Sequence, residues 1–374
     1  NQSVKTGRRI TARPVFYWLV TTDSRLQTCR AYRFIKLKNC PVKFLQQRLS
    51  ILNVFEFVTC LVLIPSVLAL GERLSWFLEL LAHFRLQYVI AALCLLIIFL
   101  GRRSWHWAAI AFVLLVTNGW FIGYALHQAK PQNDYLKGSA PFGLVLFNMN
   151  VANNRLEDLA QELVDNGPSL VVLQEYTHRA DKVLSKALAE RYPYQIAIPA
   201  NHAFGMAAFS AVPLTVISTA PLADERITTL RFKLENRNLG EITVTAMHPV
   251  PPVTPTSAKA RNNEIKAVSE WIAKQDGKQI LLGDLNLTPY SYVFRDLIET
   301  SGLRPVRPLF YNTIKTTTWP SFTLSGFFRI PIDHVLLSDD LQFTTSGWQK
   351  EFGHGSDHAL LRIELEPGPH ASLF

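Results

Sequence analysis

Cysteine is absent from most of this chain. Its four cysteines, Cys29, Cys40, Cys60 and Cys94, all precede residue 95 of 374. The region beyond them can therefore contain neither a disulfide nor a catalytic thiol. Methionine is also scarce, with three residues, and the chain begins with Asn1. We therefore expect a fragment, or a sequence read from upstream of an unusual start codon. No periodicity is visible in residues 1–45, and no structure is expected there.

An excess of positive charge is missing from the C-terminal part. Residues 1–139 hold 17 Lys and Arg against 5 Asp and Glu, a net of +12, whereas residues 140–374 hold 21 against 24, a net of −3. The charge of +9 on the whole chain thus belongs to its N-terminal part. Proteins that bind long phosphate backbones usually carry a basic excess. The balance argues mildly against a long nucleic-acid substrate, although a local basic groove remains an alternative.

Three apolar runs follow the basic N-terminal segment: Ile51–Leu70, Leu86–Leu100 and Trp105–Leu126. Because about 20 helical residues cross a bilayer core, the first and third runs fit membrane spans. The second reaches that length only if residues 84–87 join it and Arg85 extends its charge towards the interface. Helices buried in a soluble bundle are the alternative. The low charge and the aromatic flanks favour membrane spans.

Lysine and arginine predict the orientation. Eleven of them precede the first span, so this end is expected in the cytoplasm. Three spans would place everything after residue 126 outside, with the helical apolar face of Trp76–Phe84 on the outer membrane surface. The predicted organisation is a basic cytoplasmic segment (1–50), a three-helix transmembrane region (51–126), a polar linker (127–140) and a globular domain (141–374).

The globular part alternates strand-like and helix-like segments. Apolar runs predict strands at 143–147, 170–173, 206–209, 242–247, 279–282 and 332–337. Amphipathic spacing predicts helices at Leu156–Val164, Asp181–Arg191, Ala258–Ala273 and Ser291–Thr300. Strands outnumber helices, which favours layered sheets with helices outside over a simple parallel sheet.

Polar side chains stand at the edges of four β-type runs. They are Asn148-Met149-Asn150, Leu173-Gln174-Glu175, Gly283-Asp284-Leu285-Asn286 and Gly355-Ser356-Asp357-His358. Phosphate ester hydrolysis needs a hard cation, a positioned water and a clamp on the developing charge. Magnesium and manganese take oxygen ligands of these kinds. The pattern therefore predicts a metal-assisted phosphoryl site.

Glu175 is the best candidate for a metal ligand, although a solvated loop carboxylate is the ordinary alternative. Asn148 and Asn150 are two positions apart, so a strand would turn both amides to one face. The alternative for these amides is turn formation at the strand end. Asp357 is a candidate metal ligand or base.

Asp284 and Asn286 have the same spacing after their strand. Asp284 is expected to orient or deprotonate the attacking water, and Asn286 to donate to a phosphoryl oxygen. The alternative is a turn that caps the helix beginning at Ser291. His248 ends another run, and the proline-rich loop that follows would hold it rigidly at the same sheet edge.

Asp333 and His358 are the predicted dyad. The carboxylate would fix the ring tautomer, and the imidazole would act on the phosphate. His334 directly follows Asp333 and would point to the opposite face of the strand, so it is left out of the site.

Together these motifs resemble the endonuclease/exonuclease/phosphatase superfamily, over about residues 142–366. The resemblance implies a four-layer α/β sandwich with two central mixed sheets flanked by helices, and Mg²⁺ or Mn²⁺ as the cofactor. It implies metal binding by Glu175, helped by Asn148 and Asp357, and assistance at the leaving group by His248. Many nucleases of the superfamily have Asp at the position of Asn150, so this site has one negative charge fewer.

Three spans before such a domain resemble a membrane-anchored bacterial subgroup that includes the teicoplanin-resistance membrane proteins, implicated in removing phosphate from polyprenyl pyrophosphates. We therefore expect a membrane phosphohydrolase acting on a phosphate ester or pyrophosphate, including a lipid-linked one, on the outer face. The alternative is an extracytoplasmic nuclease with a basic groove. Its candidate residues are Arg226, Arg231, Arg261 and Arg304. A non-catalytic scaffold is disfavoured, because every ionisable position of the set is present.

Overall fold

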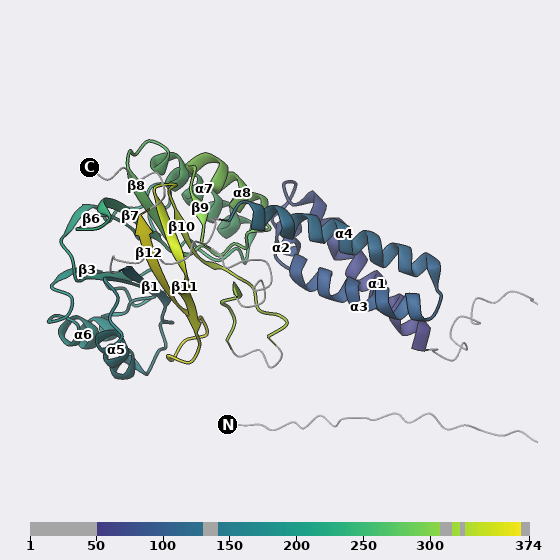
Figure 1. Cartoon of the computed structure of the whole chain (residues 1–374), viewed down its shortest axis with the longest axis horizontal. Helices are drawn as coiled ribbons and strands as arrows, with labels where there is room; N and C mark the ends of the chain where they lie inside the picture. Colours follow the sequence, from purple (N-terminus) through teal and green to yellow (C-terminus); the bar gives the residue numbers. More distant parts are fainter. Residues whose placement is uncertain (1–50, 130–140, 307–315, 322–325, 368–374) are drawn as a thin grey trace, which may run out of the picture. The chain divides into compact units, whose positions relative to one another are not determined.

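The structure is a computed structural model that describes residues 51–129, 141–306, 316–321 and 326–367, without the side chains of 51–52 and 344–348. The predicted basic segment at 1–50 and most of the predicted linker lie outside the described residues. The described chain comprises N-terminal helices followed by an α/β part (Figure 1).

Four α-helices and a 3₁₀ turn precede the sheets: α1 (Ile51–Leu68), η2 (Ala69–Gly71), α2 (Trp76–Ala82), α3 (Arg85–Gly101) and α4 (Trp105–His127). Helices α1, α3 and α4 lie side by side (Figure 1). In the described part of the chain, two helical segments, Asn53–Gly71 and Trp105–His127, are long and apolar enough to cross a membrane. α3, the expected third span, passes the same test of length and composition only when it is joined to α2, and the two helices are bent by 55°.

Arg85 differs from the sequence-based expectation, because its charge does not extend outwards. Its side chain is fully buried, and its guanidinium donates to Asn118 Oδ1 at 3.3 Å and to the Ala69 carbonyl at 3.2 Å. The guanidinium also lies 3.5 Å from the centre of the Phe121 ring. A buried charge is tolerated where hydrogen bonds and an aromatic face compensate for lost water. The charge is therefore stabilised by polar partners within the helices and not by the membrane interface.

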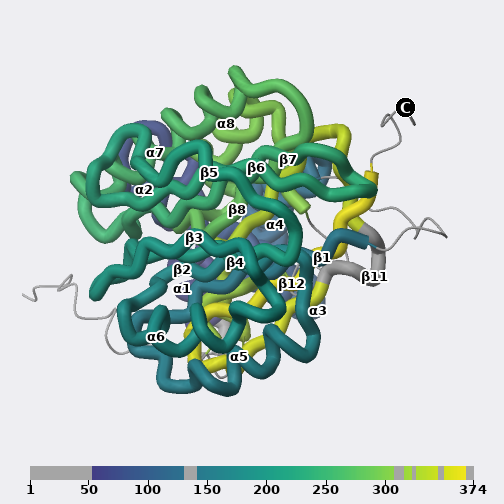
Figure 2. The backbone as a smooth tube through the Cα atoms, turned by 90° about the vertical axis from the view of Figure 1, so that its left-hand side faces the viewer, coloured from purple at the N-terminus to yellow at the C-terminus, as the bar shows by residue number. Residues whose placement is uncertain are grey.

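Two six-stranded mixed sheets form the centre of the α/β part (Figure 2). The first has the order β11-β12-β1-β2-β4-β3, and the second β5-β6-β7-β8-β10-β9. The first sheet contains β1 (Phe142–Asn148), β2 (Leu170–Gln174), β3 (Tyr194–Ile198), β4 (Met206–Ser210), β11 (Leu341–Glu351) and β12 (Leu360–Pro367). The second contains β5 (Leu214–Ser218), β6 (Thr229–Asn236), β7 (Gly240–Met247), β8 (Lys278–Asp284), β9 (Arg304–Pro305) and β10 (Asp333–Leu337). Each sheet has one parallel pair, β1 with β2 and β7 with β8.

Helices cover the outer faces of both sheets, which gives four layers. Buried side chains of α5 (Leu156–Asp165) and α6 (His178–Ala187) pack against the first sheet. Those of α7 (Pro255–Ile272) and α8 (Tyr292–Ser301) pack against the second. This arrangement is the predicted α/β sandwich.

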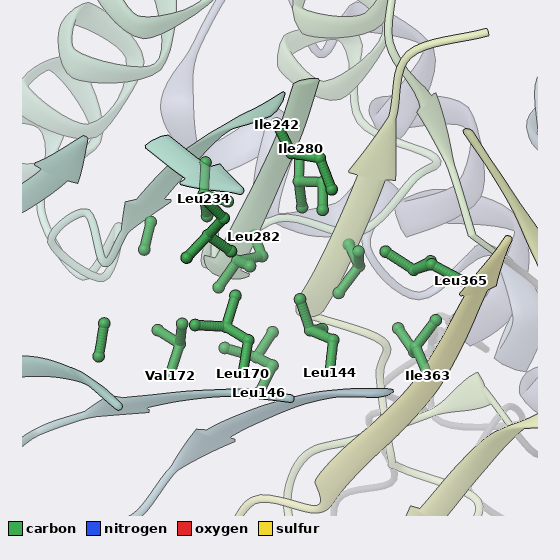
Figure 3. Close-up of a cluster of buried hydrophobic side chains, with 14 of the residues drawn as sticks. Leu144, Leu146, Leu170, Val172, Leu234, Ile242, Ile280, Leu282, Ile363 and Leu365 are labelled. Carbon is green, nitrogen blue, oxygen red and sulfur yellow. The ribbon is translucent and has the colours of Figure 1, made fainter. Parts of the chain in front are cut away.

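The main core lies between the two sheets (Figure 3). Alternation along β1 shows how the sequence builds it. Leu144 and Leu146 point into the inter-sheet core, whereas Val145 and Phe147 pack under the helices. Leu282 of β8 approaches the same core from the second sheet. Because both faces of these central strands are buried, their sequences read as continuous apolar runs.

Candidate active site

The ends of strands from both sheets meet at one edge of the sandwich. β1 and β2 are parallel, and so are β7 and β8, so each pair ends at the same edge. β10 is antiparallel to β8, with Asp333 opposite Asp284 in the register. His358 shortly precedes β12, which is antiparallel to β1 and therefore begins where β1 ends. The topology thus gathers residues that are far apart in the sequence.

Three of the predicted site residues have left-handed backbone conformations. The φ angles are +65° for Asn150, +57° for Glu175 and +51° for Asn286. Asparagine tolerates this region, but it is uncommon for glutamate, and such conformations often occur at functional sites. β1 ends at Asn148, so the left-handed turn, and not strand alternation, brings Asn150 to the site.

Two carboxylates are held by amide and indole groups. Glu175 Oε1 accepts a hydrogen bond from Asn148 Nδ2 at 3.2 Å. Asp357 accepts one from Asn150 Nδ2 and another from the Trp319 indole N–H, both at 2.8 Å. Burial raises the pKa of Asp357, but these two hydrogen bonds and the nearby His358 outweigh it and lower the pKa below its ordinary value. Asp357 is therefore an anion.

A second carboxylate group surrounds His358. Asp333 Oδ2 lies 2.9 Å from His358 Nδ1, and Asp284 Oδ2 lies 3.7 Å from His358 Nε2. Burial lowers the pKa of His358, but the charges of Asp333 and Asp284 outweigh it and raise the pKa to about 10. Burial raises the pKa of Asp284, yet His248 and His358 bring it down to about 2. Near neutral pH a cationic ring thus lies beside the ionised Asp284, with the Asp333 carboxylate at its other nitrogen.

His248 and Asn286 complete the polar side of the site. His248 Nδ1 lies 3.1 Å from the Ala203 carbonyl, so Nδ1 carries a proton, and Nε2 lies 3.4 Å from Asp284 Oδ2. Burial lowers the pKa of His248, but Asp284 reverses the effect and the pKa is raised. Asn286 donates from Nδ2 to the Pro249 carbonyl at 3.0 Å.

A cavity of about 540 Å³ opens over these groups. Seven of the nine predicted site residues line it, while Asn148 and Asp333 lie behind and hold their neighbours by the hydrogen bonds above. Apolar side chains form the rest of the wall. They are Leu80 and Phe84 from the N-terminal helices, Pro251, Pro252 and Val253 from the loop after β7, and Trp319, Ile330 and Ile332.

The oxygen-rich half of the site fits a hard divalent cation. Glu175, Asp357 and Asn150 line the cavity with carboxylate and amide oxygens, the ligands that magnesium and manganese prefer, while the predicted ligand Asn148 lies behind Glu175. A different group, Asp284, Asp333 and His358, also brings its ligand atoms within 4.8 Å of one another. Nδ1 of His358 is engaged with Asp333 at 2.9 Å, however, and hard cations prefer oxygen to imidazole nitrogen. The oxygen set is therefore the better candidate.

Sequence reasoning missed several residues of the site. Trp319 holds Asp357, and its motif carries no recognisable pattern. Gln174, beside Glu175, donates to the Met247 carbonyl of the other sheet at 2.7 Å, and its buried amide in an apolar strand was the available signal. His83, an ionisable residue between apolar helices, also lines the cavity. His334 lies elsewhere, with Nε2 at 2.8 Å from the Leu287 carbonyl.

Ionised carboxylates, a histidine and carboxylate and amide oxygens at one sheet edge form a candidate site for metal-assisted hydrolysis of a phosphoric ester. The chain matches the Endonuclease/Exonuclease/phosphatase family over residues 145–358 and belongs to it. The family consists of divalent-metal-dependent phosphoric ester hydrolases that act on phosphorylated substrates.

Solved structures of low sequence identity resemble the chain. An endonuclease/exonuclease/phosphatase from Beutenbergia cavernae is 17% identical, with a TM-score of 0.46 over 62% of this chain and 72% of that one. Sphingomyelinase C from Streptomyces griseocarneus is 17% identical, with a TM-score of 0.45 over 60% and 99%. A Staphylococcus aureus beta toxin mutant with bound magnesium ions is 16% identical, with a TM-score of 0.45 over 60% and 99%. Among curated proteins, no significant match is found.

Proposed function

We propose that this protein is a membrane-anchored, magnesium- or manganese-dependent phosphohydrolase that acts on a phosphate ester or pyrophosphate linked to a lipid. The observation that carries the proposal is the composition of the cavity. Its polar floor holds the site residues, and its wall includes Leu80 and Phe84 from the α2 region. An amphiphile fits such a cavity, because its phosphate requires polar partners and its apolar part favours burial among apolar side chains.

The nuclease alternative is less well supported. Of the described residues that line the cavity, none is Lys or Arg. Among the arginines considered for a basic groove, Arg261 is fully buried against Glu79, and Arg226 pairs with Asp224 at 2.6 Å. Arg231 is 7% exposed and lies over the Trp271 ring. These side chains do not supply the phosphate-binding surface that a polynucleotide requires.

The residues have distinct roles in the proposed reaction. A divalent cation bound by Glu175 and its neighbours would neutralise phosphoryl oxygen charge and make a bound water more acidic. Asp284, which remains ionised, accepts a hydrogen bond from the attacking water and orients it. Protonated His358 donates from Nε2 to a phosphoryl oxygen, where negative charge grows, and Asp333 holds the ring in place. One amide hydrogen of Asn286 serves Pro249, which leaves the other for phosphate.

His248 faces the same cavity and is proposed to assist at the leaving group. Its Nδ1 is held by the Ala203 carbonyl, which fixes the ring orientation and leaves Nε2 towards Asp284 and the cavity. Because Asp284 raises the pKa of His248, the ring is suited to deliver a proton.

Packing of the helices supports three membrane crossings, with the first residues of α1 on the side of the membrane opposite the catalytic site. α2 follows α1, and Glu79 of α2 pairs with Arg261 of α7, so the end of α1 lies on the catalytic side. α3 and α4 pack along each other and are joined by residues 102–104, so α4 returns along α3 to the catalytic side. If the N-terminal segment stays in the cytoplasm, as its Lys and Arg predict, the catalytic part faces outside.

A substrate panel on the purified full chain in phospholipid micelles tests the proposal. We expect Mg²⁺-dependent phosphate release from a polyprenyl pyrophosphate, about tenfold faster or more than from a short-chain water-soluble pyrophosphate, because apolar contacts contribute binding energy to the reaction. EDTA should abolish release, and so should Glu175→Gln, while the exposed Glu190→Gln should have no effect. Faster cleavage of plasmid DNA than of either pyrophosphate would instead support the nuclease.

A further inference from the structure

The loop after β8 is linked to the N-terminal helices at two points, once through Arg261 of α7 and once directly by His83. Arg261 of α7 donates from Nη1 to the carbonyl oxygen of Asn286 at 3.0 Å, and from Nη2 to Glu79 of α2 at 2.5 Å. His83, which directly follows α2, lies with Nδ1 2.9 Å from Thr288 Oγ1 and 3.3 Å from Thr288 N. Both contacts join residues about 200 positions apart, 182 for the first and 205 for the second.

Arg261 and Glu79 are suited to hold a fixed geometry. Their side chains are 0% and 1% exposed. A guanidinium is planar and can serve two acceptors at once in set directions, which a lysine ammonium on a flexible stem does less well. Because both side chains are buried, removal of either one would leave the other as an unpaired buried charge. The carboxylate of Glu79 therefore fixes where Arg261 can donate.

The accepting carbonyl belongs to a residue in a left-handed backbone conformation. Asn286 has a φ of +51°, and its own N–H donates to Asp284 Oδ1 at 2.9 Å. A left-handed residue persists where the surroundings hold it. The bond from Arg261 is one such constraint, and it acts on the residue that faces the phosphate in the proposed reaction.

We propose that Glu79 and Arg261 are positioning residues for catalysis: the helix next to the membrane spans sets the orientation of Asn286 and Asp284 through the Arg261 guanidinium. This inference rests on the proposed function. On this proposal α2 contributes to catalysis in addition to lying next to the membrane spans. The rate of phosphate hydrolysis then depends on how α2 packs against α7.

The test separates positioning from stability in the full chain. In Glu79→Leu/Arg261→Met, both charges are replaced by apolar side chains, a change that buried ion pairs often tolerate. The variant keeps its hydrophobic contacts but cannot donate to Asn286. We expect a thermal midpoint close to that of the wild type and a kcat that is about 10- to 100-fold lower, with a smaller change in KM, because a displaced catalytic group lowers the rate more than binding.

Arg261→Lys provides a second test of the positioning role if the double variant does not fold. Lysine can still pair with Glu79 but cannot serve both acceptors in the same geometry. We expect a folded protein with reduced kcat. The matched control is Asp296→Asn, which removes the exposed pair between Asp296 of α8 and Arg73, a residue that lies between η2 and α2. It should keep both the wild-type kcat and the wild-type thermal midpoint.

The outcomes are distinct. Wild-type kcat in a folded Glu79→Leu/Arg261→Met or Arg261→Lys protein would overturn the positioning role and leave the proposed function intact. A wild-type chain that releases no phosphate from any substrate with Mg²⁺ would overturn the proposed function itself. Equal losses of kcat in Asp296→Asn would assign the effect to general weakening of the contact, and would also reject the positioning role.

Discussion

Gln174 Oε1 accepts a hydrogen bond from the backbone N–H of Asp284 at 2.8 Å. Gln174 ends β2 in the first sheet, and Asp284 ends β8 in the second, so this bond joins the two sheets at the edge where the site lies. The carboxylate that contacts both histidines is thus placed in part by a neutral amide from the opposite sheet. A buried backbone donor requires such a partner.

Replacing this amide should damage both stability and rate. In Gln174→Leu, the N–H of Asp284 and the carbonyl of Met247 lose their partner in a buried place, which costs about 2–6 kcal/mol, since each unsatisfied group costs about 1–3 kcal/mol. The thermal midpoint should fall by several degrees, and kcat should fall as well. Gln195→Leu, which removes a partly buried amide from the edge strand β3, is the control. Equal behaviour of the two variants would contradict the role of Gln174.

Asp333→Asn tests the dyad. The amide keeps the size of the carboxylate but removes one of the negative charges that raise the pKa of His358, so the protonated ring is less favoured and no carboxylate fixes its tautomer. By analogy with other carboxylate–histidine pairs, kcat should fall by about 10²- to 10⁴-fold. Affinity for Mn²⁺, measured by calorimetry, should stay near the wild-type value, because the proposed ligands are untouched. The exposed Asp339→Asn serves as the control, and unchanged kcat in Asp333→Asn would reject the dyad.

Gly283→Ala should prevent normal folding of the site. A Cβ at residue 283 would lie 1.9 Å from the Met247 carbonyl oxygen, and the φ of +152° is one that side chains rarely adopt. We expect a loss of more than about 3 kcal/mol, because backbone atoms of two paired strands would have to move apart. Gly277→Ala is the matched control. Its φ is +79° but nothing lies within 4 Å, so only backbone strain of about 1–2 kcal/mol is expected. Denaturant unfolding distinguishes the two, and similar losses would contradict the steric argument.

Lys350 should give the protein a specific alkaline stability profile. Burial, followed by the nearby Arg329, lowers the pKa of Lys350 from 10.5 to about 8. Between these values the unfolded chain binds a proton that the folded chain does not, so stability should rise with pH over this window. Lys350→Met should lack this rise. Thermal midpoints of both proteins from pH 7.5 to 10.5 measure it, and parallel profiles would contradict the shifted pKa.

Four central strands could be predicted because strands that are buried on both faces form continuous apolar runs. The runs that became β1, β2, β7 and β8 are apolar on both faces, since one face meets the other sheet and the other meets helices. β3, β5, β6, β9, β11 and β12 were not predicted as strands. In β5, Val216 and Ile217 are 50% and 42% exposed, so its side chains show no contrast between a buried and a solvated face.

Side chains at strand ends could be predicted as a set, but not the contacts that hold them. Asn148, Glu175 and Asp284 stand after recognisable strands, and the edge they share follows from the topology. The residues that contact the site come from other parts of the sequence. Glu79 and His83 lie in an apolar helical stretch, where the hydrophobic pattern predicts only a membrane surface. Buried ionisable residues in such a stretch are the signal that could have indicated a functional contact.

The contact face between α2 and the α/β part also limits how the protein can be shortened. Removing everything before residue 141 would strip Arg261 of Glu79, Arg295 of Glu72 and Thr288 of His83. A water-soluble version for crystallisation would thus carry arginines without their ion-pair partners on α7 and α8. The loop after β8 would lose its contact with His83. We expect such a truncated protein to aggregate and to turn over substrate slowly. Either result would reflect the loss of these contacts and not a property of the full-length enzyme.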